Sequence, residues 1–184
     1  MSGYTIAAIP TLYRGRMYRS RLEARWAAFF DRLGWAYEYE PFDLGIWSPD
    51  FLLISPMEVL VEVKPIEHFD EEVAAKMLDA TNGENLLLTR VAPAVVSDFL
   101  EIGWSAGVKG EFRTAAVVWV VDRQVPRLVA DITDLGGCDE GTWRTFSGFG
   151  GNSKELHRRV HLFTDATKAI WADGSNAVQW EPKQ

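Results

Sequence analysis

The sequence predicts an α/β fold in which helices flank a central mixed β-sheet. Three observations indicate this class. An amphipathic helical segment is followed by three strand-like segments, a second helical segment and a wholly apolar strand, which gives the order α-β-β-β-α-β. The apolar and charged fractions, 47% and 24%, are those of an ordinary globular protein. The chain of 184 residues can bury one sizeable core, so we expect a single domain over residues 1–184.

The first helix is expected over residues 18–33. Leu22, Trp26 and Leu33 recur there at helical spacing and form one apolar stripe, and Gly34 is a suitable C-cap. The preceding residues have weak periodicity, so we expect an irregular arm or a short edge strand before the helix.

Three strands are expected next. Residues 35–42 alternate between aromatic and acidic side chains, which is typical of an amphipathic strand. Residues 47–64 (WSPDFLLISPMEVLVEVK) contain two short apolar segments, and the turn that joins them is expected at Ser55-Pro56. This stretch therefore predicts two neighbouring strands.

A second helix is expected over residues 69–80, with Asp70 as its N-cap. Residues 85–89 are wholly apolar and predict a strand that is buried on both faces. We therefore place the core of the fold in residues 17–105 and a C-terminal extension in residues 111–184.

The pattern is weaker beyond this core. Residues 93–102 are compatible with a helix, and a loop is expected over residues 103–110. A strand over residues 115–121 is expected to form a hairpin with residues 127–132. A last amphipathic helix is expected over residues 153–171. The extension thus consists of a β-hairpin and a helix.

Composition excludes several classes of protein. The single cysteine, Cys138, rules out an internal disulfide and a multi-cysteine zinc site. The apolar runs are strand-sized and the N-terminus does not resemble a signal peptide, so we expect a cytoplasmic protein with no membrane partner. The net charge of −7 argues mildly against bulk electrostatic coating of nucleic acid. Arginines nevertheless cluster over residues 14–25, ahead of an acidic stretch over residues 38–84.

Two acids and a lysine interrupt the apolar strands of residues 47–64. Asp50 opens one strand, and alternation places Glu62 and Lys64 on one face of the next. If the strands are neighbours, the two carboxylates converge and can hold Mg²⁺ or Mn²⁺, with the backbone carbonyl of Val63 as a further ligand. A metal-bound water is acidified, and Lys64 can orient it or neutralise charge on a phosphate under attack. These residue types predict metal-assisted phosphodiester hydrolysis.

A purely structural interpretation accounts for the same residues. Asp50 would cap a turn after Pro49, and Glu62 and Lys64 would form a same-face pair at a sheet edge. For Glu23, which lies at the border of the buried helix face, the corresponding alternative is a surface ion pair with Arg19.

Pro49-Asp50 followed by Glu62-Val63-Lys64 resembles the signature of the PD-(D/E)xK nuclease superfamily. The wider run RSRLEARWAAFFDRLG…YEYEP…PDFLL…VEVKP resembles small bacterial and phage nuclease-like proteins, related in pattern to TnsA-type transposon endonucleases. The resemblance covers residues 19–89. It implies a restriction-endonuclease-like αβββαβ core and a Mg²⁺- or Mn²⁺-dependent endodeoxyribonuclease acting on DNA, double-stranded by expectation. It also implies that Glu23, on the first helix, joins the metal site.

Within this interpretation other residues take supporting roles. Glu40 and Lys76 are expected to lie close behind the metal ligands. Arginines of the leading cluster are candidates for phosphate contacts, with plain surface positions as the alternative; these are Arg14, Arg16, Arg19 and Arg21.

Two other hypotheses stay open. One is a non-catalytic DNA- or protein-binding subunit that keeps the nuclease fold within a larger phage, transposon or defence complex. The other is a metal-dependent enzyme that acts on a small phosphorylated substrate. A homodimer or partner proteins are compatible with either nuclease-fold hypothesis, and the cell would be a bacterial host.

Overall fold

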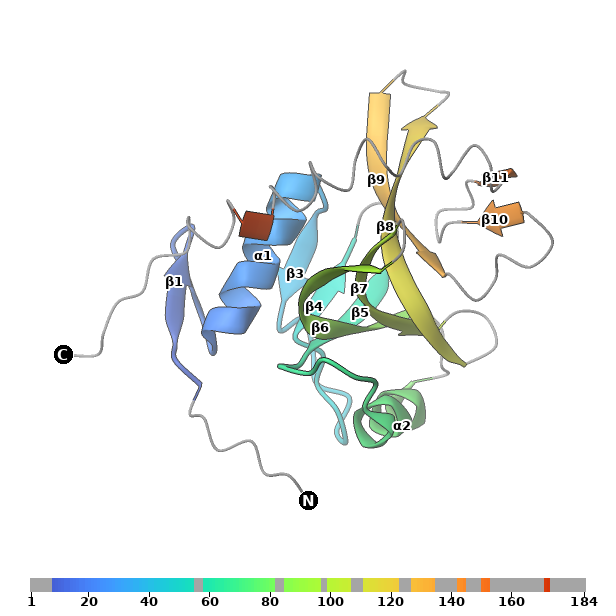
Figure 1. Cartoon of the computed structure of the whole chain (residues 1–184). Helices are drawn as coiled ribbons and strands as arrows, with labels where there is room; N and C mark the ends of the chain where they lie inside the picture. The colour runs from blue at the N-terminus through green and yellow to red at the C-terminus, as the bar shows by residue number, and fades with distance from the viewer. Residues whose placement is uncertain are drawn as a thin grey trace.

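The computed structural model describes residues 8–54, 58–81, 85–96, 99–106, 111–122, 127–134, 142–144, 150–152 and 171–172. Two helices and a large, mainly antiparallel sheet dominate this part of the chain (Figure 1). The elements are β1 (Thr11–Tyr13), β2 (Arg16–Tyr18), α1 (Arg21–Leu33), β3 (Tyr37–Tyr39), β4 (Phe51–Leu53), β5 (Val59–Val63), α2 (Glu71–Ala80), β6 (Leu86–Val96), β7 (Phe99–Ala106), β8 (Phe112–Asp122), β9 (Arg127–Asp134), β10 (Thr142–Arg144) and β11 (Gly150–Asn152).

The predicted order α-β-β-β-α-β is confirmed as α1-β3-β4-β5-α2-β6. The sheet has seven strands in the order β3-β4-β5-β6-β7-β8-β9. It is mixed, because β5 and β6 are parallel while the other neighbours are antiparallel. A parallel pair needs a crossover, and α2 supplies it between β5 and β6. The sheet therefore runs without interruption from the expected core into the strands expected as an extension.

Helix α1 begins three residues later than expected. Residues 16–18 form β2, which pairs with β1 in a hairpin, so the helix starts after its N-cap Ser20. The Ser20 hydroxyl accepts a hydrogen bond from the Glu23 N–H. At the other end Gly34 has φ 75° and closes the helix, as the sequence predicts.

The two helices cover opposite faces of the sheet (Figure 1). Trp26 and Phe30 of α1 lie in one buried cluster with Leu87 of β6, whereas Met77 of α2 lies in another with Leu86. Neighbouring residues of a strand point to opposite faces, so these clusters are separated by the sheet. Helix α2 has the predicted N-cap, because the Asp70 carboxylate accepts hydrogen bonds from two backbone N–H groups of its first turn. No helix in the described ranges is both long and apolar enough to cross a bilayer.

The helix expected over residues 93–102 is wrong, as is the loop expected from residue 103. Residues 93–96 lie in β6 and residues 99–106 in β7, and these strands pair antiparallel and lose register between Thr89 and Ala94. A register shift of this kind accommodates Pro93 inside a strand. The β8–β9 hairpin is confirmed. The helix expected over residues 153–171 lies outside the described residues, apart from its last residue.

Candidate functional site

Asp50 and Glu62 lie together where β4 begins and β5 ends. The Asp50 N–H donates to the Val61 carbonyl at 2.9 Å, so Asp50 continues the antiparallel ladder just before β4. Both acids are buried, with 5% of Asp50 and 6% of Glu62 exposed. The expected convergence of these two side chains from neighbouring strands is therefore present in the structure. A carboxylate buried to this extent needs compensating partners.

Each oxygen of the two carboxylates has such a partner. Asp50 Oδ2 accepts a hydrogen bond from the Val63 N–H at 2.8 Å, and Oδ1 lies 2.5 Å from Arg19 Nη2. Glu62 Oε1 lies 2.6 Å from Lys64 Nζ, which confirms that these residues share one strand face. Glu62 Oε2 accepts a hydrogen bond from Trp47 Nε1 at 2.7 Å. Two protein cations and two N–H donors thus hold the acids.

Glu23 is the third buried acid, with 7% of the residue exposed. Its Oε1 accepts a hydrogen bond from Ser20 Oγ at 2.7 Å, and its Oε2 accepts one from the Tyr39 hydroxyl at 2.5 Å. Arg19 Nε lies 3.9 Å from the same Oε2. The reciprocal Ser20–Glu23 contacts form a helix-capping arrangement, so Glu23 stabilises α1 as well as facing the acidic site.

Arg19 joins the acids into one network. Its side chain reaches Asp50 at 2.5 Å and Glu40, which follows β3, at 2.7 Å. Burial alone lowers the pKa of Arg19, but the Tyr39 hydrogen bond and the nearby carboxylates raise it overall. The guanidinium therefore stays charged. The Glu40 side chain joins the network through Arg19, and its backbone N–H donates a hydrogen bond to the Asp50 carbonyl at 2.9 Å.

The acidic charge is incompletely neutralised. Burial, followed by the charge of Glu62, raises the pKa of Asp50 to about 7, and Glu23 adds to the rise. The Val63 N–H and the Lys64 charge oppose it. Burial lowers the pKa of Lys64, but Glu62 and Asp50 raise it overall, so the ammonium is charged at neutral pH. When Asp50 is ionised, three buried carboxylates face two cations, and a bound cation would relieve the net negative charge.

This imbalance predicts a pH dependence of stability in the absence of metal. Because folding raises the pKa of Asp50 from 3.8 to about 7, the folded protein binds more protons than the unfolded chain between these values. The free energy of unfolding should therefore fall as pH rises through this window, by about 1–3 kcal/mol between pH 5 and pH 8. Urea unfolding at the two pH values measures the difference.

The matched control is Asp50→Asn, which cannot ionise. It should remove most of the difference in unfolding free energy between pH 5 and pH 8. If wild type and Asp50→Asn have the same pH profile, Asp50 is not the titrating group.

The donor chemistry of Asp50 and Glu62 suits a hard divalent cation. Mg²⁺ in proteins is commonly held by one or two carboxylates, and waters complete its octahedron. No cluster of three or more His, Cys, Asp or Glu side chains is placed to hold a metal within the described ranges. The fit therefore rests on the Asp50–Glu62 pair and the Val63 backbone, with Glu23 occupied by Ser20 and Tyr39.

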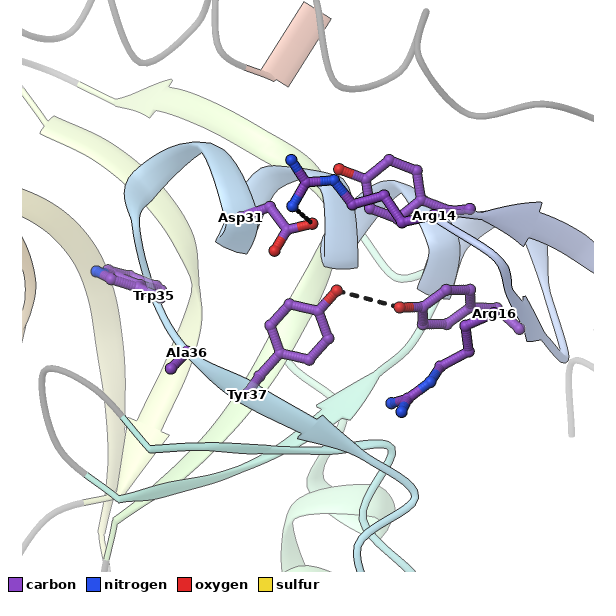
Figure 2. A pocket seen from close by; sticks show the side chains of 8 residues that line it. Arg14, Arg16, Asp31, Trp35, Ala36 and Tyr37 are labelled. Carbon is purple, nitrogen blue, oxygen red and sulfur yellow. Dashed lines mark hydrogen bonds and ion pairs between the residues drawn. The ribbon is translucent and has the colours of Figure 1, made fainter.

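The other predicted residues lie elsewhere. Lys76 is on the exposed face of α2, and it makes no ion pair with the acidic site among the residues described. Arg21, the first residue of α1, is exposed. Arg14 and Arg16 line a separate pocket beside the end of α1 (Figure 2). Of the predicted arginines, Arg19 is the one that the structure brings into contact with Asp50.

Three residues of the network were not predicted from the sequence. Trp47 and Tyr39 donate hydrogen bonds to Glu62 and Glu23, and nothing in their sequence context indicates these contacts. Ser20 could have been found, because a serine three residues before a glutamate at the start of an apolar helix is the sequence signature of a capping box.

Comparison with protein-family models, with curated proteins and with solved structures finds no match to this chain. Function is therefore inferred from the site itself. It is a buried acidic cluster with two cations, at the junction of β4, β5 and α1.

Proposed function

We propose that the protein is a Mg²⁺- or Mn²⁺-dependent endodeoxyribonuclease that hydrolyses DNA phosphodiester bonds at the Asp50–Glu62–Lys64 cluster. The observation that carries the proposal is the pairing of two buried carboxylates, close enough for Glu62 to raise the pKa of Asp50, with a lysine at the rim. A carboxyl pKa raised this far by burial and by a neighbouring acid is common at sites that bind cations or perform acid–base chemistry.

Asp50, Glu62 and the Val63 carbonyl would hold the metal. When bound, Mg²⁺ supplies an acidified water and neutralises charge on the phosphate. The Lys64 side chain is 40% exposed, so its ammonium can face both Glu62 and a substrate outside the protein. There it stabilises the negative charge that develops on the phosphate oxygens during attack.

Arg19 has a second role in this proposal. In the structure its guanidinium neutralises Asp50, yet its side chain is 58% exposed. A divalent cation on Asp50 would weaken that ion pair and leave the guanidinium available for a phosphate oxygen, for which its planar fork is well suited. Arg19 would thus exchange a protein carboxylate for the DNA backbone as the substrate binds.

The order α1-β3-β4-β5-α2-β6, with β5 and β6 parallel, supports assignment of this region to a restriction-endonuclease-like core. In such a core, we propose, the acidic site marks the place where DNA approaches. The motif Pro49-Asp50…Glu62-Val63-Lys64 lies at this place.

One observation favours a second function, a non-catalytic DNA- or protein-binding subunit. Every oxygen of Asp50 and Glu62 already has a protein partner, as expected of a network whose role is structural. DNA binding that weakens steeply with salt but does not change with Mg²⁺ would identify such a subunit.

Incubation with supercoiled plasmid DNA tests the leading proposal. We expect nicked or linear product with Mg²⁺ or Mn²⁺ and none with EDTA. The Asp50→Asn variant serves as the matched control for contaminating nuclease. Absence of cleavage of duplex, single-stranded and branched DNA with both metals would reject the enzymatic proposal.

A further inference from the structure

The pocket lined by Arg14 and Arg16 has a volume of about 380 Å³ and lies between the β1–β2 hairpin and the end of α1 (Figure 2). Its volume is within the usual range for small-ligand sites, which is about 300–1,000 Å³. Its wall includes two arginines, three tyrosines and one acid, which are Arg14, Arg16, Tyr13, Tyr18, Tyr37 and Asp31.

The pocket wall is positively charged in a chain whose net charge is −7. Arg14 Nη1 lies 3.1 Å from Asp31 Oδ2, so these two charges offset each other. Arg16 is exposed and forms no ion pair within the described ranges. Its charge lies close enough to the Tyr18 hydroxyl to oppose the burial that raises the pKa of that group. The pocket therefore offers one unopposed guanidinium and a second that is held by an exposed ion pair.

Arg14 occupies a backbone position that does not favour arginine. Arg14 and Gly15 form the two-residue loop of the β1–β2 hairpin, with φ 48° and 77°. Loops of this kind prefer Asn-Gly, and a residue with a bulky side chain costs about 1 kcal/mol there. The ion pair with Asp31 recovers little, because 71% of the Arg14 side chain is exposed. A binding role for the guanidinium would explain why an arginine stands at this position.

The pocket has aromatic walls as well as charge. The Tyr18 and Tyr37 hydroxyls, both in the pocket wall, are 3.1 Å apart and join the hairpin to β3. The Tyr13 ring stands beside Arg14, whose Cζ is 5.9 Å from the ring centroid. Guanidinium groups beside aromatic faces suit a ligand that has both a phosphate and a planar ring.

The same strand leads from this pocket to the acidic site. Arg16 begins β2, and Arg19 follows that strand and contacts Asp50. Three residues of extended chain span about 10 Å. A span of this size is short enough for one DNA strand to reach both places, because its phosphates are about 3.4 Å apart along the helix axis. The Tyr18 ring, which packs on Tyr39 at 4.5 Å between centroids, separates the two sites.

We infer that this pocket is a subsite for one nucleotide of the bound DNA strand, beside the acidic site, with its phosphate between Arg14 and Arg16. The inference rests on the proposed function for the identity of the strand. A free nucleotide carries the same phosphate and base, so the experiment must distinguish a nucleotide within a DNA strand from a free nucleotide.

The test is binding of a fluorescently labelled 20-base-pair duplex to the full chain in EDTA, where no cleavage occurs. Arg14→Asn and Arg16→Gln should each weaken binding at least about five-fold. Each should also reduce the magnitude of the slope of log affinity against log salt concentration by about one. Arg14→Asn should melt at the same or a higher temperature than wild type, because Asn is favoured in this loop. Arg113→Gln, which changes a partly exposed arginine of β8 outside the pocket wall, is the control and should bind like wild type.

Duplex affinity unchanged in both pocket variants would overturn the inference. Titration with thymidine 5′-monophosphate separates the sources: if the mononucleotide requires Arg14 and Arg16 but the duplex does not, the pocket binds a free nucleotide and the strand subsite is rejected. Cleavage is measured separately with Mg²⁺. If DNA binding depends on the two arginines but no DNA is cleaved, the proposed nuclease activity is rejected and the nucleotide subsite is supported. If DNA is cleaved but its binding does not depend on either arginine, the subsite is rejected and the proposed nuclease activity stands.

Discussion

Lys64→Ala is expected to lower the rate of DNA cleavage by at least about 100-fold, which is typical when one group that stabilises transition-state charge is removed. Lys64 Nζ lies 2.6 Å from Glu62 Oε1, and its side chain reaches solvent where the scissile phosphate would lie. Alanine removes the ammonium but leaves both carboxylates in place. Single-turnover cleavage of plasmid DNA at saturating Mg²⁺ measures this effect.

The loss of activity must be separated from loss of structure. Lys64→Ala leaves Glu62 with Trp47 as its remaining donor, and we expect it to destabilise the fold by about 1–3 kcal/mol. Thermal unfolding by circular dichroism should still show a cooperative transition above the assay temperature. Lys76→Ala, an exposed lysine of α2, is the matched control and should retain wild-type cleavage. Cleavage at the wild-type rate by Lys64→Ala would exclude Lys64 from the reaction.

Gly103→Ala is expected to destabilise the protein by more than about 4 kcal/mol, which is exceptional for a single methyl group. Gly103 lies in β7 at φ 154°, where it pairs with Thr89 of the neighbouring strand β6. A Cβ there would lie 2.0 Å from the Leu88 carbonyl oxygen and 2.8 Å from Thr89 Cα. Both are backbone atoms of the central sheet and cannot move without breaking the β6–β7 pairing. Soluble yield and urea unfolding measure the effect.

Gly34→Ala is the control for backbone conformation alone. Gly34 has φ 75°, and an added Cβ would meet nothing within 4 Å. This substitution should cost only about 1 kcal/mol from the strained backbone. If the two variants are equally stable, the close approach of β6 and β7 at Gly103 is not as described.

The core order of the fold was predictable because its signals are local. The apolar stripe of α1, the N-cap Asp70 and the apolar run of β6 each act within one element. The strands around residues 93–106 were not predictable in this way. Pro93 and Gly103 usually interrupt strands, and here the register shifts of β6 and β7 accommodate them. Such shifts depend on the partner strand and not on the local sequence.

The candidate site was also predictable where its signals are local, and not where its contacts join distant parts of the chain. Strand alternation was sufficient to place Glu62 beside Lys64, and adjacency of β4 and β5 brought Asp50 to them. The contacts of Arg19 with Asp50 and of Trp47 with Glu62 span 31 and 15 residues of sequence. They depend on how the hairpin and the β3–β4 connection fold over the sheet, for which the sequence has no short-range signal.

Metal binding by Asp50 and Glu62 is the central claim, and crystals soaked in Mn²⁺ test it most directly. We predict an anomalous difference peak bonded to oxygens of both carboxylates, with the Arg19 guanidinium withdrawn from Asp50. If there is no such peak at saturating Mn²⁺, and Arg19 and Lys64 still pair with the two acids, the cluster is a structural ion network and the proposed nuclease is wrong.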